Sequence, residues 1–207
     1  MNLTRRSVLA TGFVGLAGCL GGGDVEPGSE ETDLGVPTIG DPDAPITVEV
    51  YEDFSCGFCQ QFKRQLFPVI ETRWIEPGEV RYERRDFPIP VDAWSVPVAN
   101  AARAVQDTEG DEAFFTFTDE AYEYLGQYSY DRLATIADEL GYDGAAVRSA
   151  AEEERYQTSI DADHARGESL GVGGTPTVVV EETIVEPDED TPMIVGIEEA
   201  IEDAKAA

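Results

Sequence analysis

The chain has 207 residues, which suits one domain plus a leader, and 42% of them are hydrophobic, so it can bury a core. Acidic residues number 43 against 14 basic ones, for a net charge of −29, and this sign argues against nucleic acid as a partner. The acids are spread along segments that keep an apolar periodicity. This pattern favours a halophilic protein whose surface is adapted to high salt, with an ordinary acidic protein as the alternative.

Residues 1–18 are predicted to be a signal peptide. Arg5 and Arg6 precede an apolar run of about ten residues, which is half the length of a membrane-spanning helix. The paired arginines resemble a twin-arginine export signal. The following Leu-Ala-Gly-Cys, which ends at Cys19, resembles a lipobox. We therefore expect export, a lipid on Cys19, and anchoring on the outer face of the cytoplasmic membrane.

Residues 19–37 are rich in glycine, glutamate and proline and contain few apolar residues. Such a segment cannot bury itself, so we expect a lipidated, flexible, acidic linker. The folded domain is then expected to cover residues 38–207.

The first half of this domain reads as strand, helix, strand. Residues 46–51 are rich in β-branched side chains and predict a strand. From Cys56 to Trp74 apolar residues recur at helical spacing, and Pro68 should kink this helix. Residues 79–86 alternate and predict a second strand.

A helical block is expected from about residue 94 to 170. Its aromatic cluster, Phe114, Phe115 and Phe117, is interpreted as core, with a substrate groove as the minor alternative. Residues 177–180 predict a buried strand, residues 182–185 its hairpin partner, and residues 194–204 a terminal helix. The order of elements predicts an α/β fold with a mixed central sheet, helices on both faces, and a helical insertion between the second and third core strands.

Cys56 and Cys59 form a Cys-Gly-Phe-Cys pair at the predicted start of the first helix. Unpaired N–H groups and partial positive charge at a helix N-terminus stabilise a thiolate. We therefore expect Cys56 to be the attacking thiol and Cys59, one turn deeper, to resolve the mixed disulfide. The pattern needs no cofactor.

Metal binding is the alternative use of such a pair. Zinc requires four ligands, and once Cys19 carries lipid only His164 remains as a further soft ligand, so no metal site is predicted. Copper(I) needs fewer soft ligands and stays open.

Three segments together resemble the DsbA-like branch of the thioredoxin superfamily. They are residues 48–59 (Val-Glu-Val-Tyr-Glu-Asp-Phe-Ser-Cys-Gly-Phe-Cys), residues 82–88 (Tyr-Glu-Arg-Arg-Asp-Phe-Pro) and residues 171–177 (Gly-Val-Gly-Gly-Thr-Pro-Thr). The resemblance covers about residues 38–204. It implies a thioredoxin-like core, a cis peptide bond before Pro176 that packs against the dithiol, and a Thr175 backbone that pairs with an extended substrate segment.

The resemblance also implies a carboxylate near the first strand that relays a proton to the resolving thiol. Glu49, Glu52 and Asp53 are all candidates, and each is expected to be a solvated or strand-end acid. Gly57-Phe58 departs from the Pro-His or Pro-Tyr common in the family, so the sequence does not place the reduction potential.

Three polar residues are expected to lie on the protein surface without a role in the reaction. His164 is expected on the surface because its neighbours are polar. Lys63 and Arg64, just beyond the dithiol, are expected on a solvated helix face.

The leading hypothesis is an extracytoplasmic thiol–disulfide oxidoreductase that acts on thiols or disulfides of secreted or membrane proteins and is regenerated by an unidentified redox partner. A reductant for apo-cytochrome or copper-site cysteines is the second hypothesis. A copper(I) metallochaperone is the third.

Overall fold

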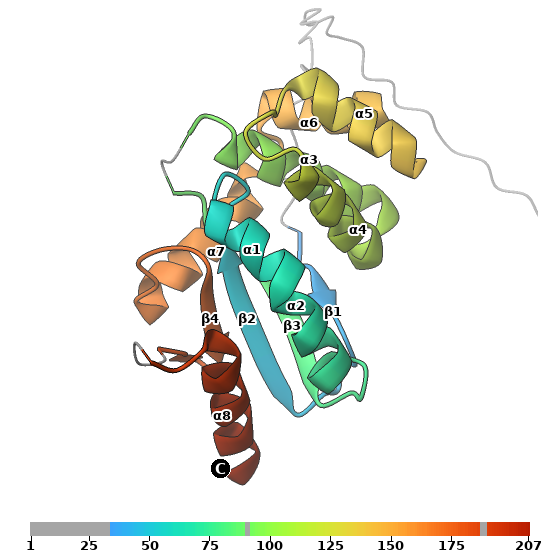
Figure 1. Cartoon of the computed structure of the whole chain (residues 1–207). Helices are drawn as coiled ribbons and strands as arrows, with labels where there is room; N and C mark the ends of the chain where they lie inside the picture. The colour runs from blue at the N-terminus through green and yellow to red at the C-terminus, as the bar shows by residue number, and fades with distance from the viewer. Residues whose placement is uncertain (1–33, 90–91, 187–189) are drawn as a thin grey trace, which may run out of the picture.

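The computed structural model describes residues 34–89, 92–186 and 190–207. The predicted leader, Cys19 and most of the predicted linker lie outside these residues. Figure 1 shows a sheet with helices packed against it and a block of helices at one end.

The sheet is mixed, as predicted. Its strand order is β1-β3-β2-β4-β5, with β2 and β3 parallel and every other neighbouring pair antiparallel. The predicted strands and the hairpin are confirmed, and a short edge strand, β1, is added. The bounds are β1 Thr38–Ile39, β2 Ile46–Glu52, β3 Val80–Asp86, β4 Thr177–Val180 and β5 Thr183–Ile184.

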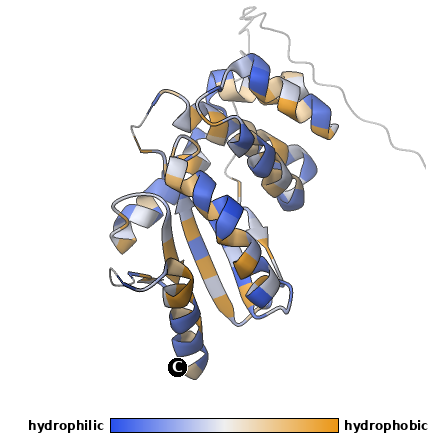
Figure 2. Ribbon diagram, viewed as in Figure 1, coloured by the Kyte–Doolittle hydropathy of each residue, from blue (hydrophilic) through white to orange (hydrophobic). Residues whose placement is uncertain are grey.

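The central strand β2 divides its side chains between the two faces of the sheet, because successive residues point to opposite sides. Val48, Val50 and Glu52 share one face, whereas Glu49 and Tyr51 share the other. Figure 2 shows the resulting alternation of hydrophobic and hydrophilic residues along β2.

The expected first helix is present but broken into pieces. It consists of α1 (Gly57–Gln65), α2 (Phe67–Ile70) and a single π-helical turn (Glu71–Ile75). The break falls at Leu66, because Pro68 has no N–H to continue the hydrogen-bond ladder. Phe62 and Ile70 from these pieces are buried in the same core cluster as Val48 and Val50.

The helical insertion is also confirmed, and its aromatic cluster is core: Phe114 and Phe117 are fully buried and Phe115 nearly so. It contains α3 (Ser95–Glu109), α4 (Asp111–Glu123), α5 (Tyr130–Leu140), α6 (Gly144–Glu153) and α7 (Gln157–Leu170).

Two helices complete the layers around the sheet. Helix α7 packs on β3 over the face that carries Tyr51, and a Cβ at Gly167 would stand 2.8 Å from the Phe87 and Tyr51 rings, so only glycine allows this approach. The terminal helix α8 (Met193–Ala206) packs against β4 and β2.

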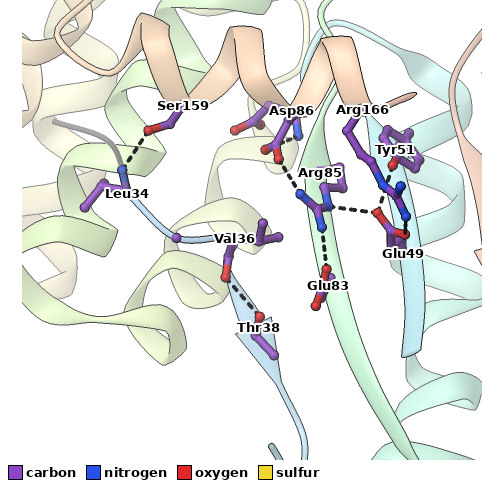
Figure 3. A network of polar contacts seen from close by, with 12 residues as sticks. Leu34, Val36, Thr38, Glu49, Tyr51, Glu83, Arg85, Asp86, Ser159 and Arg166 are labelled. Carbon is purple, nitrogen blue, oxygen red and sulfur yellow. Dashed lines mark hydrogen bonds and ion pairs between the residues drawn. The ribbon is translucent and has the colours of Figure 1, made fainter. Parts of the chain in front are cut away.

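Residues 34–37, which the sequence places in the linker, lie against the helical insertion. The backbone N–H of Leu34 donates to Ser159 Oγ at 2.8 Å (Figure 3), and the Gly35 carbonyl accepts from Arg103 and Gln106 at 3.0 and 2.9 Å. The Pro37 carbonyl accepts from the Arg84 N–H at 3.0 Å. Residues 34–37, the N-terminal strap, therefore belong to the packed part of the chain. They are held by these hydrogen bonds and by the packing of Leu34 against the hydrophobic core.

A buried ion network joins the sheet to the insertion. Arg103 of α3 contacts Asp86 of β3 at 2.7 Å and also pairs with Asp163 of α7. Arg85 contacts Asp163 at 3.0 Å. It also contacts Glu49 at 3.0 Å (Figure 3). Because the guanidinium of Arg103 is 1% exposed, its charge depends on these partners rather than on water.

Within the described residues, no helix is both long and apolar enough to cross a membrane.

Candidate active site

Cys56 and Cys59 lie where the first helix meets the end of β2. Cys56 is the N-cap of α1, with an extended backbone, and Cys59 lies one turn into the helix. Cys56 is 7% exposed and Cys59 is fully buried. Of the two sulfurs, only that of Cys56 belongs to a residue that keeps some accessible surface.

The two thiols have opposite electrostatic environments. A hydrogen bond from the Cys59 thiol lowers the pKa of Cys56 to about 5, against the opposing effect of burial, and Thr175 and the backbone N–H groups of Phe58 and Cys59 add to the lowering. Burial, the hydrogen bond to Cys56 and the charge of Glu52 raise the pKa of Cys59 well above its ordinary value. Cys56 is therefore a thiolate at neutral pH, while Cys59 keeps its proton.

The loop before β4 faces the dithiol. The peptide bond between Thr175 and Pro176 is cis, as the resemblance implied. Cys56 Sγ lies 3.3 Å from the Thr175 carbonyl oxygen, although 119 residues separate them in sequence. The third of the resembling segments is thus confirmed to pack against the first.

A groove runs beside Cys56 between α1 and α8. It is lined by Phe58, Leu66, Pro176, Val178 and Met193, together with Gln61, Phe62, Gln65 and Thr175. No charged side chain is among these described residues, in a chain of net charge −29. Phe58, between the two cysteines, is 71% exposed and supplies an apolar surface at the mouth of the groove.

Asp53 holds the turn that leads into Cys56. Its carboxylate accepts from the Ser55 N–H at 2.7 Å, from the Ile89 N–H at 2.7 Å and from Ser95 Oγ at 2.9 Å. Burial nevertheless raises the pKa of Asp53 above its ordinary value. Asp53 therefore ties the dithiol turn to the start of the helical insertion.

Glu52 is the carboxylate on the dithiol side of the sheet. It is 1% exposed, accepts from Tyr122 Oη at 2.7 Å and from Tyr82 Oη at 3.4 Å, and lies 3.8 Å from Arg84 Nε. Its charge acts on Cys59. Glu49 points to the opposite face, where it pairs with Arg85 and Arg166 at 3.0 and 3.1 Å.

Glu52 is the last residue of β2, as a strand-end acid would be, but none of the three carboxylates is solvated, since Glu49, Glu52 and Asp53 are all at most 5% exposed. The interpretation failed because the cations and hydroxyls that allow a carboxylate to be buried come from distant parts of the chain, such as Arg84 and Tyr122.

Two further expectations need correction. Lys63 is buried rather than solvated: its ammonium lies 2.8 Å from Asp119 and 3.5 Å from the centre of the Phe67 ring. His164 is only partly exposed, because its ring stacks on Phe87 at 4.2 Å. For Arg64 the solvated face is confirmed, at 48% exposure.

Among the described residues, no group of three or more histidine, cysteine, aspartate or glutamate side chains could hold a metal ion. The dithiol itself remains a pair of soft sulfur ligands.

The rate at which Cys56 reacts with iodoacetamide should rise through about pH 5 and level off above it, because the thiolate is the nucleophile. The Cys59→Ala variant should move this midpoint upward, towards that of an ordinary cysteine, because the largest stabilising hydrogen bond is lost. Stopped alkylation followed by mass spectrometry would measure both profiles. A common midpoint in the two proteins would contradict the assignment of that hydrogen bond.

A dithiol at a helix N-terminus, opposed by a cis-proline loop on this sheet, defines the class as the thioredoxin-fold thiol–disulfide oxidoreductases. The family model described as thioredoxin matches residues 32–203, and the chain belongs to this family.

Similar proteins share most of the length of the chain. This chain is 26% identical over 161 residues to a probable disulfide bond formation protein D of Bacillus cereus, and the match covers 74% of each of the two chains. It is 21% identical over 159 residues to the disulfide bond formation protein D of Bacillus subtilis, with 73% of this chain and 70% of the relative covered.

Solved structures show the same fold. Oxidised BdbD from Bacillus subtilis superposes with a TM-score of 0.74 at 21% identity, over 83% of this chain and 94% of that one. DsbA from Chlamydia trachomatis superposes with a TM-score of 0.71 at 23% identity, over 83% and 92% of the two chains.

Proposed function

We propose that the protein works outside the cytoplasm, where it exchanges disulfides with thiols of secreted or membrane proteins. The observation that carries this proposal is the asymmetry of the dithiol: an accessible Cys56 thiolate lies beside a buried, protonated Cys59. Such a pair forms and resolves a mixed disulfide without metal or cofactor.

The low pKa of Cys56 favours net oxidation of substrates. A thiol of low pKa is a good leaving group, and a stabilised thiolate favours the reduced form of the protein, so its disulfide is a strong oxidant. The relatives named as disulfide bond formation proteins support the same direction. A redox partner must then reoxidise the pair.

Each residue of the site has a role in this proposal. Cys56 forms the mixed disulfide and Cys59 resolves it. The backbone of Thr175, held beside Cys56 with Pro176, pairs with an extended substrate segment. Glu52 exchanges the proton of Cys59, because it is the candidate carboxylate on the dithiol face and its charge acts on that thiol.

The test is transfer of disulfides to a reduced, unfolded model protein in buffer that contains a metal chelator. Oxidised protein should lose one disulfide for each pair of substrate thiols that is consumed. Faster reduction of substrate disulfides by the reduced protein would favour the reductant. No transfer in either direction, combined with tight copper(I) binding, would favour a metallochaperone.

The proposal includes a lipid anchor at Cys19. We expect the wild-type protein in the membrane fraction and the Cys19→Ser variant in soluble or unprocessed form, because the variant offers no thiol to the lipid. Fractionation with immunoblotting measures this. A twin-lysine variant of Arg5-Arg6 should block export if the twin-arginine route is used. Equal membrane retention of wild type and Cys19→Ser would contradict the anchor.

The proposal also includes adaptation to high salt. At a net charge of −29, the melting temperature should rise from dilute to molar salt, since the screening length falls to about 3 Å at 1 M. Thermal unfolding followed by circular dichroism would show this rise. A melting temperature that is flat over the same range would show that the acidity serves another purpose.

A further inference from the structure

Tyr122, near the end of α4 in the helical insertion, contacts the dithiol region at several points. Its hydroxyl donates to Glu52 at 2.7 Å and lies 3.4 Å from the Asp53 carbonyl oxygen. Its ring lies 5.3 Å from that of Phe54, and its backbone carbonyl accepts from the side chain of Gln60, the residue after Cys59. Tyr122 thus connects the helical insertion to the residues on either side of the cysteine pair.

Among the described residues, the partners of the Glu52 carboxylate are all buried. Tyr122 makes the shorter of two tyrosine hydrogen bonds, at 2.7 Å against 3.4 Å for Tyr82, and Arg84 stands at 3.8 Å. All four side chains are at most 1% exposed, so water does not replace a lost donor easily. A donor to a buried carboxylate favours its charged form.

Tyr122 remains a donor at every pH at which the protein would work. Burial and the nearby charge of Glu52 raise the pKa of its hydroxyl well above the ordinary value. Its hydroxyl proton is therefore always available to Glu52.

We propose that Tyr122 is a positioning residue for the exchange reaction: its hydroxyl keeps the Glu52 carboxylate charged and oriented to take the proton of Cys59. The helical insertion thereby sets the pH at which the buried cysteine becomes reactive. This inference rests on the proposed function.

With a mixed disulfide on Cys56, the Cys59 thiol passes its proton to the Glu52 carboxylate, and the Cys59 sulfur attacks the Cys56 sulfur. The Cys56–Cys59 disulfide forms, the bond from Cys56 to the substrate sulfur breaks, and the substrate leaves as a thiolate with the electron pair. In the reverse direction Cys59 leaves as a thiolate and takes the proton back from Glu52.

The experiment uses reduced protein and one equivalent of 5,5′-dithiobis(2-nitrobenzoate), which releases a coloured thiolate in each of two steps. The first release reports attack by Cys56, and the second reports resolution by Cys59. In the Tyr122→Phe variant the pH midpoint of the second rate should rise by about one unit, the size expected for one hydrogen bond to a charged group. The first rate should keep its wild-type profile.

Tyr156→Phe is the matched control. Tyr156 also belongs to the insertion, is buried, and donates to a carboxylate, Asp107, at 2.8 Å, but it has no contact with Glu52. Its second-release profile should match the wild type. Tyr82→Phe removes the longer bond to Glu52 and should give a smaller rise than Tyr122→Phe.

Glu52→Gln decides whether Tyr122 acts through Glu52. In the Glu52→Gln background, adding Tyr122→Phe should leave the second-release profile unchanged. An unshifted midpoint in Tyr122→Phe, an equal shift in Tyr156→Phe, or a shift that persists without Glu52 would each overturn the inference. Absence of the first release in the wild type would instead refute the proposed function.

Discussion

The Cys56→Ser variant should lose all disulfide exchange, whereas Cys59→Ser should still attack a disulfide substrate and remain covalently linked to it. The cause is the unequal burial of the pair: Cys56 is the thiolate that keeps some accessible surface, at 7% exposure, and Cys59 is fully buried and protonated. Without Cys59 the mixed disulfide on Cys56 has no internal nucleophile to resolve it. Non-reducing gels of Cys59→Ser should therefore show adducts that a reductant releases.

The double variant, which has neither thiol, is the control for adducts formed elsewhere on the chain. Adducts trapped by Cys56→Ser and not by Cys59→Ser would reverse the two roles. If neither variant traps substrate and both lose copper(I) binding, the metallochaperone explains the pair better than exchange does.

Replacing Arg103 by leucine should lower the free energy of unfolding by about 3–5 kcal/mol, the usual cost of leaving buried charges without their partner. Arg103 neutralises Asp86 and Asp163 at once, and it also donates to the Gly35 carbonyl of the N-terminal strap. Urea unfolding at constant salt would measure the loss. Arg73→Leu is the matched control, because its partner Glu198 is solvent-exposed and the pair should matter little.

The loss should depend on pH in a defined direction. In the wild type, burial alone would raise the pKa of Asp86, but Arg103 and Arg84 hold it below its ordinary value, so the ion pairs of Asp86 stabilise the fold above that value. In Arg103→Leu the buried carboxylates favour their protonated forms. The difference from wild type should therefore be largest near neutral pH and should shrink towards pH 4. A difference that is constant over this range would mean that Arg103 contributes packing rather than charge.

The sequence predicts the strands and the helical insertion well, because each carries its own periodicity. β2 is rich in β-branched residues, and Phe114 and Phe117 follow the spacing of a buried helix face. The break at Leu66 was also predictable, because Pro68 causes it locally. The packing of the strap at Leu34 was not predictable, because it depends on a hydrogen bond to Ser159, far away in the sequence.

The cysteine pair was visible from its spacing, and the cis-proline loop only from the resemblance. Strand alternation could have selected Glu52 over Glu49, since Glu52 shares its face with Val48 and Val50. Tyr122 could not have been singled out, because its spacing marks it as one more apolar residue of α4. Its role arises from a contact between residues 70 positions apart in sequence.

Both borders of the sheet, β1 and β5, are strands of only two residues. At molar salt, screening removes most of the mutual repulsion that keeps so acidic a protein dispersed. A long, bare border strand would then offer unpaired backbone groups to neighbouring molecules and seed aggregation. Short borders would limit such pairing by a means that does not depend on charge, and this matters most at the salt concentrations at which charge is screened.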